Sequence, residues 1–187
     1  NAQGTPYTVF FYAISDTPAT ASGTWQQEQV DPGSKAESYT MPQTLAHPPE
    51  VGQLISNGAY LTFATSAQQA VNVKVGLSFV SMAQAKRNAL GEVHGFDFDG
   101  TRSAAIAAWD KALSAIQVTG ASDAELTKLS TALYHSLLMP VDRTGENPLW
   151  QSAVPYYDDF YTLWDTFRSS NPLITLIDQP REVAIVN

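Results

Sequence analysis

Hydrophobic positions in the first 80 residues follow the period of β-strands. The clearest case is residues 71–80, where five apolar side chains, from Val71 to Phe79, stand at every second position and alternate with Asn, Lys, Gly and Ser. A period of two places these five side chains on one face of a strand. One apolar and one polar face are typical of an antiparallel sheet, as in a β-sandwich. We therefore expect partner strands to bury the apolar face, and we expect this face to stay exposed if a truncated sandwich does not supply them.

Two weaker strand patterns precede this one. Residues 8–14 are aromatic and apolar on both faces, which predicts a buried strand, and residues 60–65 predict another. Residues 15–35 are rich in small and polar side chains, which predicts loops with at most one short strand. The segment between residues 35 and 60 is interrupted by Pro42, Pro48 and Pro49.

The period changes to that of helices after Ser81. Residues 81–90 form a short candidate helix, and an alanine-rich helix is predicted over 101–118, ending before Gly120. Ser122 and Glu125 form a capping-box pair that predicts the start of the next helix. The apolar stripe of that helix consists of Leu126, Leu129, Leu133 and Leu137, and Pro140 marks its end.

The last third of the chain predicts a loop over 141–155 and two further helices. Asp158 or Asp159 is expected to cap the first, and Pro172 to stop it, because a residue before proline avoids the helical region. Pro180 suits the first turn of the second helix, with Asp178 near its start. The apolar stripe of the first consists of Phe160, Leu163, Trp164 and Phe167.

Composition excludes several classes of function. The formal net charge is −8, from 18 acidic and 10 basic residues, which disfavours binding to nucleic acids or anionic membranes. The chain has no cysteine, so disulfides and thiolate chemistry are excluded. No apolar run is long enough to span a membrane. The first four residues lack signal-peptide features, and the absence of an initiating Met favours a processed or truncated chain.

Few residues have the spacing of a metal or nucleophile site. His47, His94 and His135 lie far apart and share no ligand spacing, so His135 could line a site but is better explained as a structural residue. Asp97 and Asp99 lack the further carboxylates of a calcium loop, and capping of the helix that follows explains them better. Neither a Gly-x-Ser-x-Gly motif nor a phosphate-binding glycine loop is present.

The segment from 154 to 177 has the most unusual chemistry. On a helix, Tyr161, Trp164, Asp165 and Arg168 would share one flank. Aromatic rings stack on the C–H faces of sugars, and charged groups hydrogen-bond sugar hydroxyls. The alternative is an ion pair between Asp165 and Arg168 on the surface, beside a tryptophan in the core.

Four segments in the same order resemble glycoside hydrolase family 92. They are VGLSFVS at 75–81 with AQAKRN at 83–88, FDFD at 96–99 with AAW at 107–109, TALYHSLLMP at 131–140, and TLWDTFR at 162–168 followed by PL at 172–173. The resemblance covers about residues 70–177. It implies α+β architecture, with part of an antiparallel β-sandwich over 1–80, a helical linker over 81–120, and the first helices of an (α/α)6 barrel over 121–187.

The resemblance also implies a function. Family 92 enzymes are secreted, calcium-dependent, exo-acting α-mannosidases that invert configuration, which requires an acid and a base set apart by a water. Their acid, base and calcium ligands come from later barrel segments, so neither a catalytic nor a metal-binding residue is assigned here. By resemblance, Asp165 would bind hydroxyls of the mannose in the −1 subsite, supported by Trp164 and Arg168. The connection over 141–155 is shorter than is usual in the family.

We therefore expect a portion of an α-mannosidase that acts on mannose-containing glycans together with the rest of the same enzyme, which could be a separate chain. The isolated chain is expected to be inactive. Two rival hypotheses are a carbohydrate-binding module without a hydrolytic partner, and a structural domain in which Trp164 and Asp165 serve packing.

Overall fold

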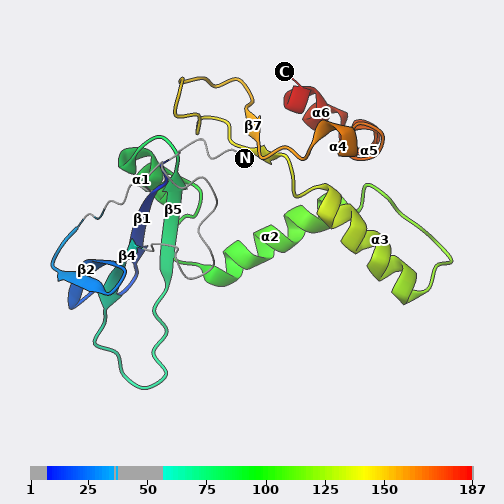
Figure 1. The fold of residues 1–187 in the computed structure, drawn as a ribbon. Coiled ribbons are helices and arrows are strands. Elements are labelled where there is room, and N and C mark those ends of the chain that lie inside the picture. Colours follow the sequence, from blue (N-terminus) through cyan, green and yellow to red (C-terminus); the bar gives the residue numbers. More distant parts are fainter. Residues whose placement is uncertain (1–7, 36, 38–56, 187) are drawn as a thin grey trace. The chain divides into compact units, whose positions relative to one another are not determined.

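The computed structural model describes residues 8–35, 37 and 57–186 (Figure 1). The chain forms two compact units. One unit is Ile14–Lys74, and the other combines the residues up to Ala13 with Val75–Asn187. The sequence-predicted domain boundaries at residues 80 and 120 stay predictions. The prolines at 42, 48 and 49 lie outside the described residues.

The Ile14–Lys74 unit contains a three-stranded antiparallel sheet in the order β3-β2-β4. The prediction of loops over 15–35 is wrong, because β2 and β3 form a hairpin there. Backbone pairing needs no apolar side chains, and at Gly23 a side chain would lie 2.6 Å from the Tyr60 ring. The strand predicted from residue 60 begins three residues earlier. The bounds are Ala21–Gln26 for β2, Gln29–Pro32 for β3 and Asn57–Thr62 for β4.

The second sheet pairs β1 (Phe10–Ser15) with β5 (Val73–Ser78). Both strands occur where the sequence predicts them, but β1 is less buried than predicted. β1 is only partly covered, and Phe11 is 41% exposed. Along β5 the small and polar residues Gly76 and Ser78 are buried, whereas the apolar side chains that alternate with them are exposed.

Helix α1 (Met82–Gly91) explains why the face of β5 with small and polar residues is the buried one. Its buried residues are Ala85 and Ala89, and both lie against Gly76, where an added Cβ would meet their backbone atoms. Only a strand face of small residues allows a helix to approach so closely. The larger side chains therefore remain on the other face, with Val73, Val75 and Leu77 exposed by 49%, 55% and 57%.

We expect this apolar face to bind a hydrophobic dye when the chain is produced alone. Val75→Thr together with Leu77→Thr should lower dye fluorescence and change the melting temperature little, because more than half of each side chain is already exposed. Leu133→Thr is the matched control: Leu133 is 4% exposed, so its substitution should destabilise by about 2 kcal/mol or more. Unchanged dye binding by the double variant would contradict the prediction.

Helices α1 to α3 each begin after a residue whose side chain caps the helix, and the sequence indicates the caps at Asp97 and Ser122. The hydroxyl of Ser81 accepts from the Gln84 amide at 3.1 Å, and the carboxylate of Asp97 accepts from the Gly100 amide at 2.8 Å. The capping interpretation of Asp97 is therefore confirmed. The bounds are Met82–Gly91 for α1, Phe98–Leu113 for α2, which ends well before Gly120, and Asp123–Ser136 for α3.

The capping box of α3 is also confirmed. Glu125 accepts from the Ser122 amide at 2.8 Å, and the Ser122 hydroxyl accepts from the Glu125 amide at 3.4 Å. Leu133 and Leu137 of the predicted stripe are buried, and the helix ends at Ser136, ahead of Pro140.

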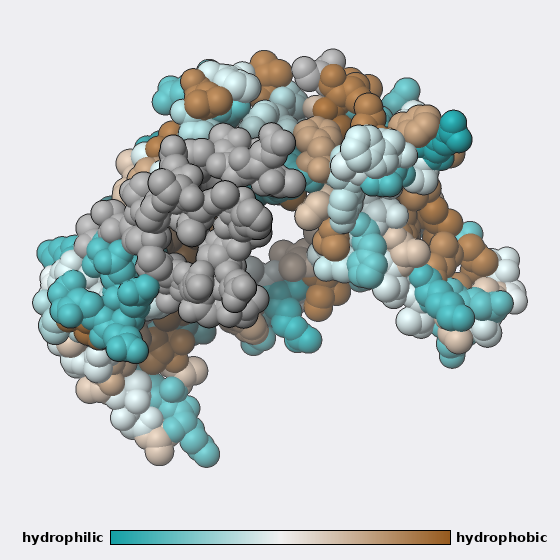
Figure 2. Space-filling view, viewed as in Figure 1, coloured by the Kyte–Doolittle hydropathy of each residue, from teal (hydrophilic) through white to brown (hydrophobic). Residues whose placement is uncertain are grey.

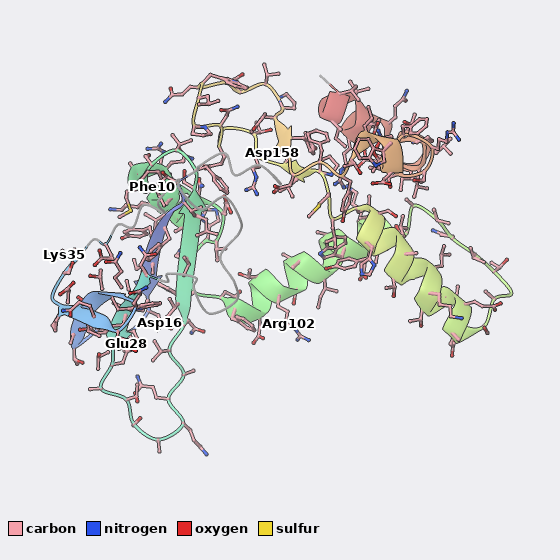
Figure 3. All side chains as sticks on the ribbon, viewed as in Figure 1. Phe10, Asp16, Glu28, Lys35, Arg102 and Asp158 are labelled. Atoms are coloured by element: carbon pink, nitrogen blue, oxygen red, sulfur yellow. The ribbon has the colours of Figure 1, made fainter. Side chains whose placement is uncertain are left out.

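The single helix expected from Asp158 or Asp159 to residue 171 is absent. Asp158 (labelled in Figure 3) lies in β7, which pairs with β6 in an antiparallel arrangement. Asp159 has a φ of 58°. Pro172 does not end a helix but lies in the first turn of α5, where its missing N–H needs no partner. The bounds are Val141–Asp142 for β6, Tyr157–Asp158 for β7, Leu163–Thr166 for α4, Ser170–Ile177 for α5 and Gln179–Val186 for α6.

Candidate functional site

The candidate residue Asp165 lies in α4, a single helical turn. Its carboxylate accepts a hydrogen bond from the hydroxyl of Thr162, the residue just before the helix, and its amide donates to the Thr162 carbonyl at 3.0 Å. These two bonds fix Asp165 in the first turn. The side chain is exposed, and its second oxygen has no partner among the described residues, so it is available to accept from a ligand.

The other two candidates flank Asp165, and neither of their side chains forms a hydrogen bond or an ion pair with its carboxylate. Trp164 is 76% exposed, and the Arg168 guanidinium lies 4.9 Å from the centre of the Phe167 ring. Within the described part of the chain, the ion pair present joins Arg143 and Asp159, not Asp165 and Arg168. The alternative of a surface ion pair beside a core tryptophan is therefore wrong on both counts.

The prediction that these residues share one flank of a single helix is also wrong. Tyr161 precedes α4 and Arg168 follows it, so the four residues do not stand on one continuous helix. They belong to an exposed aromatic segment, and Figure 2 shows hydrophobic residues at the surface over the C-terminal helices. Its exposed apolar members are Phe160, Tyr161, Leu163, Trp164 and Phe167.

A cavity of about 420 Å³ lies next to this segment. It is mainly apolar, and the Asp165, Trp164 and Arg168 side chains do not line it. The three candidates thus lie together in sequence on an open surface but not in an enclosed pocket. The cavity is lined by Met139, Pro140, Phe160, Tyr161, Leu163, Thr166, Ser170, Asn171, Ile174, Ile185 and Val186.

Sequence reasoning missed a polar cluster around Glu146. Its carboxylate accepts hydrogen bonds from the Ser78 hydroxyl at 2.6 Å, the Phe79 amide at 2.9 Å and the Asn88 side chain at 2.7 Å. Burial acts to raise the pKa of Glu146, but these bonds and the nearby Arg143 charge outweigh it and hold the pKa below its ordinary value. The carboxylate is therefore ionised at neutral pH.

The described residues contain no group of three or more histidine, cysteine or carboxylate side chains placed to hold a metal ion. His135 is exposed, with its ring 5.6 Å from that of Tyr134, and His47 lies outside the described residues. Across the same part of the chain, none of the helices combines the length and apolar character needed to cross a bilayer.

Comparison with known families decides the classification. A sequence model described as the glycosyl hydrolase family 92 catalytic domain matches residues 84–187. A second, described as the N-terminal domain of the same family, matches residues 1–78. This chain belongs to glycosyl hydrolase family 92. The family predicted from the four segments is thus confirmed.

Individual relatives agree. A secreted glycosidase of Arthroderma benhamiae is 42% identical over 120 residues, which cover 61% of this chain and 16% of that protein. The family 92 chain resembles the structure of an inverting mannosidase of the family from Bacteroides thetaiotaomicron, with a TM-score of 0.67 at 23% identity over 94% of this chain and 23% of the other. A second family 92 glycosyl hydrolase gives a TM-score of 0.65 at 23% identity, over 96% of this chain and 23% of that one.

These structural likenesses confirm the predicted fold class, an antiparallel β-sandwich portion followed by a helical region of a partial chain. The chain spans about a sixth of the length of its curated relative.

Proposed function

We propose that this chain is part of a secreted, exo-acting, inverting α-mannosidase that removes α-linked mannose from glycans. The observation that carries the proposal is the match of residues 84–187 to the family 92 catalytic domain, since this range includes the Asp165 segment. The fold shared with an inverting mannosidase and the secreted glycosidase relative support the same substrate class and location.

The chain's proposed contribution is sugar binding. Asp165 offers an exposed carboxylate held in place by Thr162, and carboxylate oxygens form strong hydrogen bonds with sugar hydroxyls. Trp164 and Phe167 add exposed aromatic surface beside it, and the Arg168 guanidinium adds donors. Among these residues, Asp165 is proposed to contact mannose, with Trp164 and Arg168 supporting it.

The chemical step is proposed to depend on the remaining part of the same enzyme. Inversion uses two carboxyl groups about 6.5–9.5 Å apart, with a water between the base and the sugar. We propose that both carboxyl groups come from later segments of the same enzyme. Calcium, which takes about six to eight oxygen ligands, is proposed as the cofactor, with ligands supplied by later segments.

The proposal is tested with the intact protein that contains this sequence. We expect hydrolysis of an aryl α-mannoside, with β-mannose as the first product in a proton NMR time course, and little hydrolysis of the matching aryl α-glucoside. Activity should be lost on chelation and restored by added calcium. The isolated chain of 187 residues should be inactive on the same substrate.

Each result has a clear opposite. α-Mannose as the first product would contradict inversion. Full activity after chelation would contradict the calcium requirement. Binding of mannose glycans by the intact protein without any hydrolysis would favour a carbohydrate-binding module.

A further inference from the structure

The Glu146 carboxylate joins two parts of the chain that are distant in sequence. Ser78 is the last residue that matches the family 92 N-terminal domain, whereas Glu146 and Asn88 lie in the range that matches the catalytic domain. One carboxylate oxygen accepts from the Ser78 hydroxyl and the Phe79 amide, and the other accepts from the Asn88 side chain. The side chain therefore connects the end of β5 to α1 and to the loop that follows β6.

Every neighbour of this carboxylate is a donor whose orientation is fixed. The Ser78 side chain is 1% exposed, and its oxygen accepts from the Val80 amide at 3.0 Å, so its hydrogen points to Glu146. The Asn88 amide nitrogen also donates to the Leu77 carbonyl at 2.7 Å, and its oxygen accepts from Gln84 at 2.8 Å. Rotating the Asn88 amide group by half a turn would break its bonds to Leu77 and Gln84. Its nitrogen is therefore held as a donor toward Glu146, and both oxygens of residue 146 must act as acceptors.

The same loop is bonded to the segment that leads to Asp165. The Glu146 amide donates to the Arg143 carbonyl at 2.8 Å, and the Arg143 amide donates to the Tyr156 carbonyl at 2.7 Å. The Arg143 guanidinium lies 4.3 Å from the centre of the Phe79 ring and forms an ion pair with Asp159 at 2.7 Å.

Asp159 stands three residues before Thr162, which holds the Asp165 carboxylate. The contacts therefore run from the end of β5, through Glu146 and Arg143, to Asp159, and the backbone continues from Asp159 to α4.

We propose that Glu146 is a positioning residue for the sugar-binding segment. Its carboxylate holds the loop after β6 against β5 and α1. Arg143 of that loop forms the ion pair with Asp159, which fixes the segment leading to Asp165 and so the position of the Asp165 carboxylate. The inference rests on the proposed function, because it takes Asp165 to bind mannose.

The test is Glu146→Gln in the intact protein. Glutamine keeps the size of the side chain but turns one acceptor into a donor, which must then face Ser78 and Phe79 or Asn88, all of them donors. We expect the affinity for a mannose-configured iminosugar, measured by calorimetry, to fall by about three- to thirtyfold. This corresponds to the loss of about one hydrogen bond between the protein and the ligand. Hydrogen exchange should rise over residues 156–168.

Glu125→Gln is the matched control. The Glu125 carboxylate likewise accepts hydrogen bonds, but both come from Ser122 within the capping box of α3. It should lower the melting temperature slightly and leave both iminosugar affinity and exchange at 156–168 unchanged. Ser78→Ala, which removes a single bond to Glu146, serves if Glu146→Gln does not fold, and should change both readouts in the same direction by less.

Two outcomes overturn the inference. One is a folded Glu146→Gln protein whose iminosugar affinity is within about twofold of the wild type, since such a difference in binding free energy is smaller than the contribution of a single hydrogen bond. The other is unchanged exchange over 156–168. If the wild-type protein does not bind the iminosugar, the proposed function fails, and exchange at 156–168 still decides whether Glu146 positions this segment.

Discussion

Gly76→Ala is expected to destabilise the protein by about 3 kcal/mol or more, because it forces a methyl group into a closed contact. A Cβ at Gly76 would lie 2.1 Å from the Ala85 carbonyl oxygen, 2.5 Å from the Ala89 amide nitrogen and 2.8 Å from the Ala89 Cβ. Two of these atoms belong to the α1 backbone, which a rotamer change cannot move. The substitution must therefore displace α1 from β5.

Urea unfolding of the wild type and the variant measures this effect. Gly91→Ala is the control, since no atom lies within 4 Å of a Cβ added there. A methyl group in that open position should be neutral or stabilise by up to about 1 kcal/mol, by restricting the unfolded chain. A Gly76→Ala protein as stable as the wild type would show that α1 does not pack on β5 as described.

Local signals along the sequence predicted the helix starts well. The caps at Ser81, Asp97 and Ser122 depend on residues three positions away, so they are visible in a short window of sequence. The strand at β5 was equally visible from its period of two. These elements are determined by neighbours along the chain, which is why the sequence alone was sufficient to place them.

Which face of β5 is covered could not be read from the same pattern. Periodicity separates the two faces but does not say which partner approaches each one. Here α1 covers the face of Gly76 and Ser78, because small residues on both elements allow close contact. Exposure of the apolar face was expected for a sandwich portion without partner strands, but the cover of the opposite face by α1 was not predicted.

The local structure around the candidate residues was predicted only in part. The sequence singled out Asp165 but did not predict that its helix ends at Thr166. Pro172 was expected to end that helix, whereas it lies in the first turn of α5. The bond between Glu146 and Ser78 joins residues 68 positions apart, and Glu146 lies outside the four segments that resemble the family. Contacts of that range depend on the tertiary fold, which no local pattern reports.

Asp165→Asn in the intact protein is expected to lower kcat/KM for an α-mannoside by about tenfold to a few hundredfold. A charged acceptor contributes about 1.5–3 kcal/mol per hydrogen bond, and about 1.4 kcal/mol corresponds to a factor of ten. Asparagine keeps the shape and one acceptor oxygen, so the bond from the Thr162 hydroxyl can persist. Because the side chain is exposed, the melting temperature should change little.

Asp123→Asn provides the matched control for Asp165→Asn. Asp123 is also an exposed aspartate in the first turn of a helix, α3, so the substitution removes the same charge from the same kind of position. It should leave kcat/KM unchanged, which separates loss of a ligand contact from loss of net charge. If Asp165 instead served packing, its variant would lose melting temperature while activity per folded molecule was preserved. A stable and fully active Asp165→Asn protein would rule out both roles and leave Asp165 as an ordinary solvated residue of α4.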